Sequence, residues 1–598
     1  MHRNLRDYLN VLRRERELVE VRAPVSARLE VAEIHRRVIA AGGPALLFTN
    51  VEGARFPLAM NLYGTARRVE LGFGRRAQQF LTRLVGAVET LVPPTLDKLW
   101  GARDIASTLF HVGMRKRARG AVTEVVDTAA DLRELPITTS WLEDGGPFLT
   151  LPLVYTEHPG DHRHNLGIYR MQLHDARRLG MHWQIGKGGG FHYHEAEALG
   201  AALPVTVFLG GPPALIAAAI APLPEHVGEL LLASLLIGAK LDRVVPGPGP
   251  HPLVAEAEFA LIGEVPAHER APEGPFGDHY GYYSLRHDYP VFHLRALAHR
   301  RDAIYPATVV GKPRQEDFFL GDYLQELLSP LFPLVMPGVR ALWSYGETGY
   351  HSLAAAVVRD RYAREAMVSA FRILGEGQLA LTKFLLVTDS PRDLRDFKAL
   401  LEHMLARARF ERDLFVFGCL SMDTLDYTGP RVNEGSKGVL LGLGEPCREL
   451  PREFRGALPH GVQNAQVYCA GCLVIEGPSF AAEPRAAERI ARANEVAEWP
   501  LVILADDAVR ATASTARFLW TVFTRFEPAA DIFASRVELV RNHPAFSPPI
   551  VIDARLKPSY PAELFCDPAT AATVTRRWRE YFPDGGVNMG DSDRGHLG

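Results

Sequence analysis

The sequence predicts a multidomain protein of mixed α/β and β structure, in which a β-rich domain separates two α/β domains. Three observations predict this fold class. With 598 residues the chain is too long for one hydrophobic core. Apolar residues at helical spacing alternate with short apolar runs towards both ends of the chain. Between about residues 122 and 297, short β-rich runs punctuated by Gly, Pro and His replace this pattern.

The first predicted domain covers residues 1–120. Near-helical spacing of apolar residues predicts one helix over residues 5–19 and a second over residues 29–39. The run ALLFTNV at residues 45–51 predicts a strand, and a third periodic set predicts a helix over residues 80–91. Helices that alternate with a strand indicate an α/β domain.

The second predicted domain covers residues 121–300 and forms a β-barrel or a compact sheet. Its strands are predicted from the runs LTLPLVYT, LPVTVFLG and EAEFALIGEV, and one helix interrupts them over residues 227–236. Strands and helices alternate again over residues 301–560, which predicts a second α/β domain. Residues 561–598 are predicted to form a C-terminal tail whose end has little to bury and is mobile or a docking extension.

The composition excludes several classes of protein. Lys and Arg number 67 against 70 Asp and Glu, so the near-neutral chain has no electrostatic attraction for nucleic acid. Five cysteines cannot form a secreted disulfide framework, and the charged first twenty residues lack the apolar core of a signal peptide, which predicts a cytoplasmic protein. The most apolar stretch, from Ala202, is interrupted by Gly-Gly-Pro-Pro and predicts no transmembrane segment, which leaves peripheral membrane contact open.

The first cluster that could carry chemistry is NLGIYRMQ, at residues 165–172. Arg170 is its informative residue, because a guanidinium among apolar residues needs an anionic partner. A carboxylate fits the two-pronged donor geometry of Arg. The alternative interpretation is a purely structural salt bridge.

The second cluster is MHWQIGKGGGFHYH, at residues 181–194. Its glycines allow the backbone to approach a ligand closely, and Lys187 supplies a positive charge that suits a phosphate. The cluster lacks the pattern of a P-loop and of a dinucleotide fingerprint. A zinc hydrolase is the rival hypothesis, although the spacing does not match a known zinc site; its candidate ligands are His182, His192 and His194.

The third cluster is APEGPFGDHYGYY, at residues 271–283, in which prolines and glycines rigidify and turn the chain between Glu273 and Asp278. Near Arg170, one carboxyl group could ionise and pair while the other, in an apolar pocket, keeps a raised pKa and delivers a proton. The alternative interpretation is an ordinary surface turn.

Together, the three clusters resemble the core of the UbiD family, decarboxylases that use prenylated FMN. LRDYLNVL, GGPALLFTNVEG and NLYGTARRVELGFG also resemble the N-terminal domain of that family. The resemblance covers about residues 5–285 and continues more weakly through the C-terminal third. It implies that the central domain is a split β-barrel that binds the flavin.

The resemblance also implies site residues. Asn165 and Glu229 match the positions that bind a divalent metal, commonly Mn²⁺, which tethers the phosphate of the prenylated FMN, and K⁺ is a further candidate cofactor. Arg170, Glu273 and Asp278 match the catalytic network, with Asp278 as the proton donor. The flavin-contacting positions correspond to Ile168, Tyr169, Arg170, His182, Trp183, Gln184, Lys187 and Gly188.

One residue departs from the family pattern. Members usually carry a His, often a metal ligand, immediately before Lys/Arg-Gly-Gly, and this sequence has Gly186 there. Three alternatives stay open: Asn165 and Glu229 hold the ion with phosphate and water, a nearby histidine substitutes, or the phosphate is bound mainly by Lys187.

The implied activity is reversible, non-oxidative decarboxylation of an aromatic or α,β-unsaturated carboxylic acid. Because long members resemble those assigned to menaquinone biosynthesis, a naphthoate-type substrate is expected first and 4-hydroxybenzoate derivatives, as in ubiquinone biosynthesis, second. A flavin prenyltransferase is the expected cofactor supplier, a homo-oligomer (dimer or hexamer) is the expected assembly, and Lys437 is a candidate substrate contact. The alternatives are a flavin-binding protein without decarboxylase activity and the metal-dependent hydrolase.

Overall fold

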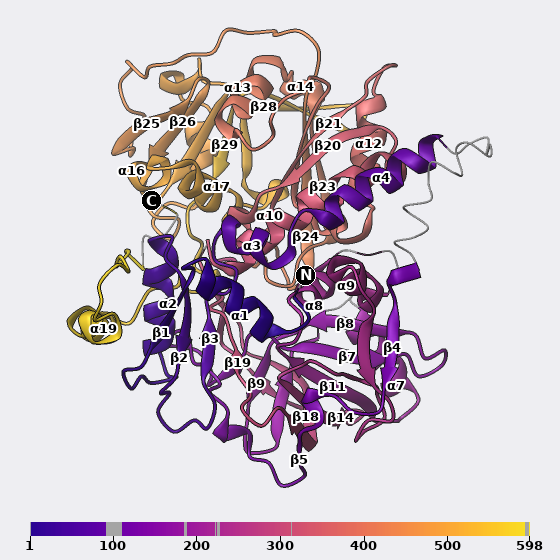
Figure 1. Cartoon of the computed structure of the whole chain (residues 1–598). Coiled ribbons are helices and arrows are strands. Elements are labelled where there is room, and N and C mark those ends of the chain that lie inside the picture. Colours follow the sequence, from indigo (N-terminus) through magenta and orange to yellow (C-terminus); the bar gives the residue numbers. More distant parts are fainter. Residues whose placement is uncertain are drawn as a thin grey trace. The chain divides into compact units, whose positions relative to one another are not determined.

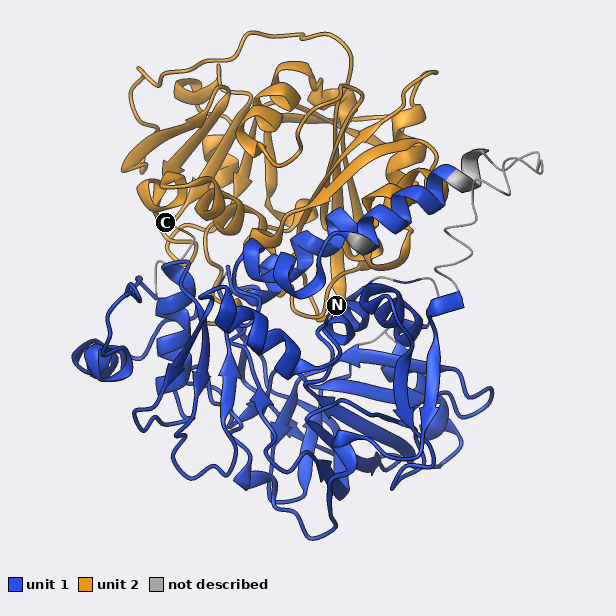
Figure 2. Ribbon diagram, in the orientation of Figure 1, with its two compact units in different colours: residues 1–327, 563–595 blue, residues 328–562, 596–598 orange. Residues whose placement is uncertain are grey.

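The computed structural model describes residues 2–90, 110–183, 188–221, 223, 228–312, 314–592 and 597. The chain divides into two compact units (Figures 1 and 2). Unit 1 combines residues 1–327 with residues 563–595, and unit 2 combines residues 328–562 with residues 596–598. The predicted mixed α/β fold class is confirmed, whereas the predicted boundaries at 120, 300 and 560 stay predictions.

The N-terminal part of unit 1 is a four-stranded sheet, in the order β1-β2-β3-β19, with helices beside it. The predicted second helix is confirmed, but the first one ends at Arg14, and Val19 lies in β1, which pairs in parallel with β2. The elements are α1 (Leu5–Arg14), β1 (Leu18–Val21), α2 (Glu30–Ala40), β2 (Ala45–Phe48), β3 (Leu58–Met60), α3 (Ala66–Phe73), α4 (Arg76–Thr90) and β19 (Tyr305–Pro306).

A ten-stranded sheet forms the centre of unit 1 and curls into a half-barrel, as the β-rich sequence pattern predicts. Its order is β6-β9-β10-β18-β14-β11-β7-β8, and β5 and β15 also pair with the long β18. The strands are β5 (Val125–Asp127), β6 (Phe148–Leu149), β7 (Leu153–Glu157), β8 (His164–Ile168), β9 (Met171–Leu173), β10 (Arg178–Met181), β11 (Leu203–Leu209), β14 (Phe259–Val265), β15 (Arg270–Glu273) and β18 (His287–His299).

Three helices accompany this sheet, and two of them were not predicted. The predicted one is α9 (Glu229–Ile237), whereas α8 (Ala214–Ile220) follows β11 and α7 (Gly188–Ala198) begins within the glycine cluster. Unit 1 also has two smaller sheets and the helix α10 (Glu316–Leu328). Their strands are β4 (Met114–Arg117), β12 (Leu241–Val244), β13 (Leu253–Val254), β16 (Phe276–Gly277) and β17 (Tyr283–Ser284).

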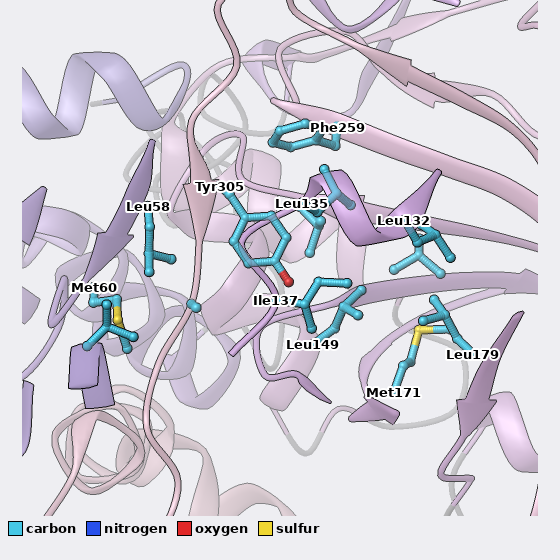
Figure 3. Packing of buried hydrophobic residues seen from close by; sticks show 14 of the residues in the cluster. Leu58, Met60, Leu132, Leu135, Ile137, Leu149, Met171, Leu179, Phe259 and Tyr305 are labelled. Carbon is cyan, nitrogen blue, oxygen red and sulfur yellow. The ribbon is translucent and has the colours of Figure 1, made fainter. Parts of the chain in front are cut away.

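The C-terminal segment returns to unit 1 and packs there. Its helix α19 (Pro568–Tyr581) lies beside α2 (Figure 1). None of residues 583–592 is buried and most are exposed, as expected of an end with little to bury. This end is nevertheless attached to unit 1, because the partly buried Val587 packs against the core and the Gly590 N–H donates to Arg37 O at 3.0 Å. This core is continuous from the N-terminal sheet to the half-barrel; Figure 3 shows Leu58, Met60, Leu149, Met171, Leu179, Phe259 and Tyr305 within it.

Unit 2 contains two five-stranded sheets with the same strand order and strand directions, a repetition that the sequence does not show. In each sheet three parallel strands lie between two antiparallel edge strands. The strands are β20 (Val339–Ser344), β21 (Leu353–Val358), β22 (Phe384–Thr388), β23 (Leu414–Ser421) and β24 (Glu434–Gly442), then β25 (Asn464–Cys469), β26 (Cys472–Glu476), β27 (Leu501–Ala505), β28 (Ile532–Val540) and β29 (His543–Asp553).

The helices of unit 2 confirm the predicted alternation of helices and strands. The longer ones are α12 (Glu365–Leu374), α13 (Phe397–Arg407) and α17 (Thr515–Phe523). Among the described residues of the whole chain, no helix combines the length and the apolar character that a membrane crossing needs.

Candidate active site

Arg170 lies between β8 and β9, and its side chain is 9% exposed. Its Nε and Nη2 atoms donate to Oε1 and Oε2 of Glu273, at 2.8 and 3.1 Å. Nη1 donates to Asp278 Oδ2, and Nη2 also donates to Ser284 Oγ at 3.1 Å. The pairing with Glu273 uses the planar, two-pronged geometry of a guanidinium. The structure therefore brings together the three residues of the predicted catalytic network.

Glu273 and Asp278 are held by β15 and by the hairpin of β16 and β17. Glu273 ends β15 and pairs with His287 of β18. Gly274 then turns the chain with a φ of +91°, which L side chains rarely adopt, and its N–H donates to Gln172 Oε1 at 2.8 Å. Asp278 follows β16, so one short, folded segment brings both carboxylates to the same guanidinium.

His182 is a second partner of Glu273. Its Nδ1 lies 3.2 Å from Glu273 Oε2, and its ring packs on Tyr289 with centroids 4.3 Å apart. Burial, and then the Arg170 charge, lower the pKa of His182, which favours the neutral imidazole. Because an ionised carboxylate only accepts hydrogen bonds, Nδ1 carries the proton and donates, and Nε2 is left as an acceptor.

Both carboxyl groups of the network are ionised. Burial is the largest influence and raises the pKa of each, but the Arg170 charge and hydrogen bonds from neighbouring groups together bring the pKa of Glu273 and that of Asp278 to about 2. Hydrogen bonds from His182 to Glu273 and from the His279 N–H to Asp278 Oδ1, at 2.7 Å, act in the same direction. The expectation that one carboxyl keeps a raised pKa is wrong for this structure, because one guanidinium pairs with both.

Asn165, Tyr169 and the N-terminus of α7 form a second group of polar atoms. The Tyr169 hydroxyl accepts from Asn165 Nδ2 at 3.4 Å and from the Gly189 N–H at 3.2 Å. A Cβ atom on Gly188 would lie 2.2 Å from Asn165 Oδ1, so this close approach requires glycine. The first N–H groups of a helix have no partner within the helix and suit a phosphate.

Glu229 is the first residue of α9, and its Oε2 is buried without a hydrogen-bond partner among the described residues. Burial raises the pKa of Glu229, although the N–H groups of Glu229 and Leu166 oppose this shift. The Glu229 charge also contributes to the raised pKa of Tyr169, after burial, so Glu229 and Asn165 act on the same hydroxyl. A buried carboxylate oxygen without a partner fits a cation, and both side chains offer hard oxygen ligands.

Aromatic rings form a wall beside this second group. The Trp183 ring lies 5.2 Å from that of Tyr169 and stacks on Tyr193 at 6.2 Å, and Ile168 ends β8 next to Tyr169. The Trp183 Nε1 is buried without a partner among the described residues. Residues 184–187 of the predicted flavin loop, which include Gln184, Gly186 and Lys187, lie outside the described residues.

The three histidines of the zinc hypothesis do not converge. His182 bonds Glu273, His192 is buried and bonds Thr156 Oγ1 at 2.9 Å, and His194 is exposed on α7. In the part of the chain that the structure describes, no group of three or more His, Cys, Asp or Glu side chains could hold a metal ion. The geometry gives the metal-hydrolase alternative no support.

Asp144 is a residue of the site that the sequence did not indicate. Its carboxylate accepts N–H groups from Gly277 at 2.8 Å, Trp141 at 2.8 Å and Ser140 at 3.0 Å. Burial raises the pKa of Asp144 to about 6, although these hydrogen bonds and the Arg170 charge oppose the shift. Asp144 thus fixes the backbone immediately before Asp278.

Lys437 lies in unit 2, on β24, where it is buried and donates to Thr382 O at 3.0 Å. Burial lowers the pKa of Lys437 to about 8, although Asp426 and Asp423 raise it. Its predicted contact with the substrate stays a prediction.

Three models of one family match the chain. The 3-octaprenyl-4-hydroxybenzoate carboxy-lyase (UbiD) N-terminal domain matches residues 9–88, the Rift-related domain residues 114–313 and the C-terminal domain residues 318–442. A Chlamydia pneumoniae protein, named as a subunit of 4-hydroxybenzoate decarboxylase, is 50% identical over 580 residues, which is 97% of this chain and 98% of that protein.

Solved structures show the same fold. Vanillic acid decarboxylase of Sedimentibacter hydroxybenzoicus, in its closed form, has a TM-score of 0.66 at 23% identity, over 77% of this chain and 96% of that chain. The UbiD-class enzyme HmfF from Pelotomaculum thermopropionicum, in complex with FMN, has a TM-score of 0.62 at 23% identity, over 76% and 97%. With family models along most of its length and a relative 50% identical over 97% of it, this chain belongs to the UbiD family of carboxy-lyases and is a decarboxylase.

Proposed function

We propose that the protein uses prenylated FMN to decarboxylate an aromatic acid, of the hydroxybenzoate or naphthoate type, in a reversible and non-oxidative reaction that quinone biosynthesis could use. The observation that supports this proposal most is the Arg170 guanidinium, which pairs with two carboxylates and lies 4.6 Å from the centre of the Phe276 ring. Because a relative 50% identical is named for 4-hydroxybenzoate, hydroxybenzoates take precedence over naphthoates as the proposed substrate.

The residues around Tyr169 fit the proposed cofactor. Asn165 and Glu229 would hold a divalent cation, Mn²⁺ in our proposal, and the N–H group of Gly188 at the start of α7 would bind the phosphate. Trp183 would pack against the flavin. When bound, the prenylated flavin supplies an electrophile for the substrate carbon that bears the carboxylate and accepts the electron pair released with CO₂.

The network would orient the substrate and move the proton. Arg170 would bind the substrate carboxylate, and Glu273 would keep the guanidinium in place from its other side. When the substrate carboxylate binds Arg170, the ion pair between Arg170 and Asp278 weakens. Burial then raises the pKa of Asp278, so that Asp278 Oδ2 takes up a proton. That proton would pass to the carbon from which CO₂ has left.

The test is reconstitution. The protein is co-expressed with a flavin prenyltransferase, bound prenylated FMN is identified by absorbance and mass, and CO₂ release is measured with hydroxybenzoic, dihydroxynaphthoic and cinnamic acids. We expect CO₂ from at least one hydroxybenzoic acid. A protein that holds prenylated FMN and releases no CO₂ from any acid would instead be the flavin-binding protein without decarboxylase activity.

Removal of the proposed metal ligands should abolish flavin binding. We expect Asn165→Ala and Glu229→Gln each to lower the bound flavin per protein at least tenfold, because each loses an oxygen donor of the proposed cation site. Flavin absorbance and elemental analysis of the purified proteins measure this. His194→Ala, on the exposed face of α7, is the control and should keep both flavin and metal. Full flavin content in Glu229→Gln would remove Glu229 from the site.

The identity of the metal, a role for K⁺, the dimeric or hexameric state and the cytoplasmic compartment stay predictions. Elemental analysis of the holoprotein and light scattering in solution address the first three directly.

A further inference from the structure

The backbone that carries Asp278 closes on itself. The Asp278 N–H donates to Tyr282 O at 3.0 Å, and the Gly281 N–H donates back to Asp278 O at 2.8 Å. Gly281 has a φ of +87°, which favours glycine at this turn. Residues 277–282, called the Asp278 loop below, therefore place the Asp278 carboxylate through the positions of Gly281 and Tyr282.

The far side of this loop is bonded to residues from the other end of the chain. The Leu564 N–H donates to Gly281 O at 3.0 Å, and Glu563 forms an antiparallel β-bridge with Tyr282. Leu564 is fully buried and Tyr282 is 2% exposed, so water does not compete for these backbone groups. Glu563 and Leu564, called the C-terminal clamp below, extend the hairpin of the Asp278 loop by one more strand segment.

The clamp is itself fixed by buried charges. The Glu563 carboxylate pairs with Lys312 Nζ at 2.9 Å, and the two side chains are 8% and 7% exposed. Lys312 Nζ also lies 3.9 Å from the centre of the Phe565 ring. A buried pair at this distance limits the movement of Glu563, because separating the charges would leave each one unpaired in the interior.

Beyond the clamp, the same segment is anchored to the N-terminal sheet and its helices. Arg577 Nη1 donates to Glu30 Oε1 at 2.5 Å, and Arg37 Nη1 donates to Thr575 Oγ1 at 2.8 Å. This second anchor ties α19 to α2, whereas the clamp bonds the Asp278 loop. It therefore offers a matched control for the clamp.

We propose that Glu563 and Leu564 are positioning residues for Asp278, so that the C-terminal segment belongs to the catalytic apparatus of the half-barrel. The clamp touches neither substrate nor flavin; it acts by holding Gly281 and Tyr282, which set the Asp278 carboxylate against Arg170. Together with Asp144, which bonds the Gly277 N–H, the clamp fixes the loop on both sides of Asp278. The catalytic part of this inference rests on the proposed role of Asp278 as proton donor.

The test uses the reconstituted holoenzyme with Glu563→Ala and Glu563→Gln. A small displacement of a catalytic group lowers turnover steeply, so we expect Glu563→Ala to lower kcat at least tenfold. Because substrate and flavin contacts are untouched, KM and bound flavin should stay within twofold of the wild type. The solvent deuterium isotope effect on kcat should rise, because protonation becomes slower, and Glu563→Gln, which keeps a hydrogen-bonding side chain, should recover part of kcat.

A second measurement follows the loop itself. Hydrogen exchange of a peptide that covers residues 277–282 should be faster in Glu563→Ala than in the wild type. Arg577→Met, which breaks the other anchor of the same segment, should change neither kcat nor the exchange of this peptide. If Glu563→Ala folds poorly, the same comparison is made with Glu563→Gln.

Three results would overturn the inference: unchanged kcat in Glu563→Ala, equal losses of kcat and bound flavin, or unchanged exchange of the Asp278 loop. Failure of the proposed function would be seen in the wild-type protein, which would bind prenylated FMN but release no CO₂.

Discussion

Asp278→Asn is expected to lower kcat by about 10²- to 10⁴-fold while bound flavin stays at the wild-type level. The amide keeps the shape of the side chain and a contact with Arg170, but it cannot take up and deliver a proton. Arg170 stays paired with Glu273, so the site should keep its geometry. Single-turnover kinetics with the reconstituted holoenzyme and the preferred acid measure the effect.

The matched control for this variant is Asp288→Asn, which removes an exposed carboxylate from the neighbouring strand β18. It should leave kcat unchanged. Turnover of Asp278→Asn at the wild-type rate would assign the proton transfer to another group of the site, for which the buried Asp144 carboxyl is the next candidate.

Arg170→Gln is expected to abolish measurable turnover and to lower the free energy of unfolding by about 3–5 kcal/mol at neutral pH. The substitution leaves Glu273 and Asp278 buried without their shared cation. Wild-type turnover in this variant would exclude Arg170 as the group that binds the substrate carboxylate.

The pH dependence of this loss follows from the pKa values. In the wild type the two carboxyl groups have a pKa of about 2, below the value of about 4 for an unfolded chain, so they stabilise the fold above pH 4. That stabilisation is lost as the pH falls from about 4 towards 2. Without Arg170, only the hydrogen bonds from His182 and His279 still act against burial, which raises the pKa of both groups. Both carboxylates then oppose folding at neutral pH, and less so as they become protonated.

Denaturant unfolding of wild type and Arg170→Gln between pH 5 and 8 measures this dependence. The difference in unfolding free energy should be largest at pH 8 and should shrink towards pH 5. Arg178→Gln, which breaks an exposed pair with Asp175, is the control and should show a small, pH-independent change. If the difference in unfolding free energy between wild type and Arg170→Gln were also independent of pH, another group would have to balance the charges of Glu273 and Asp278.

The catalytic network could be predicted from the sequence because its signals are local. Arg170 stands among apolar residues, and Glu273 and Asp278 stand in a segment stiffened by proline and turned by glycine. Their ionisation could not be predicted, because only the folded chain shows that one guanidinium pairs with both carboxylates.

Other parts of the fold could not be predicted, because they depend on contacts between residues that are distant in the sequence. Asp144 bonds the N–H of a residue 133 positions away, which no local pattern indicates. The helix α7 begins with three glycines, which are poor helix formers, and it forms because it packs on β7, β8 and β11. Val19 continues a helical spacing but lies in a strand, because parallel pairing with β2 outweighs its local preference.

The return of the chain to unit 1 has a consequence for biosynthesis. The half-barrel leaves the ribosome early in translation. Residues 563–592 emerge only after unit 2 has been translated up to residue 562. These late residues complete the core of unit 1 and bond the Asp278 loop. Since chains fold from the N-terminus as they emerge, the nascent half-barrel stays incomplete throughout the synthesis of unit 2. A message truncated before codon 563 would therefore produce a protein with every predicted flavin and catalytic residue but without the segment that completes their domain.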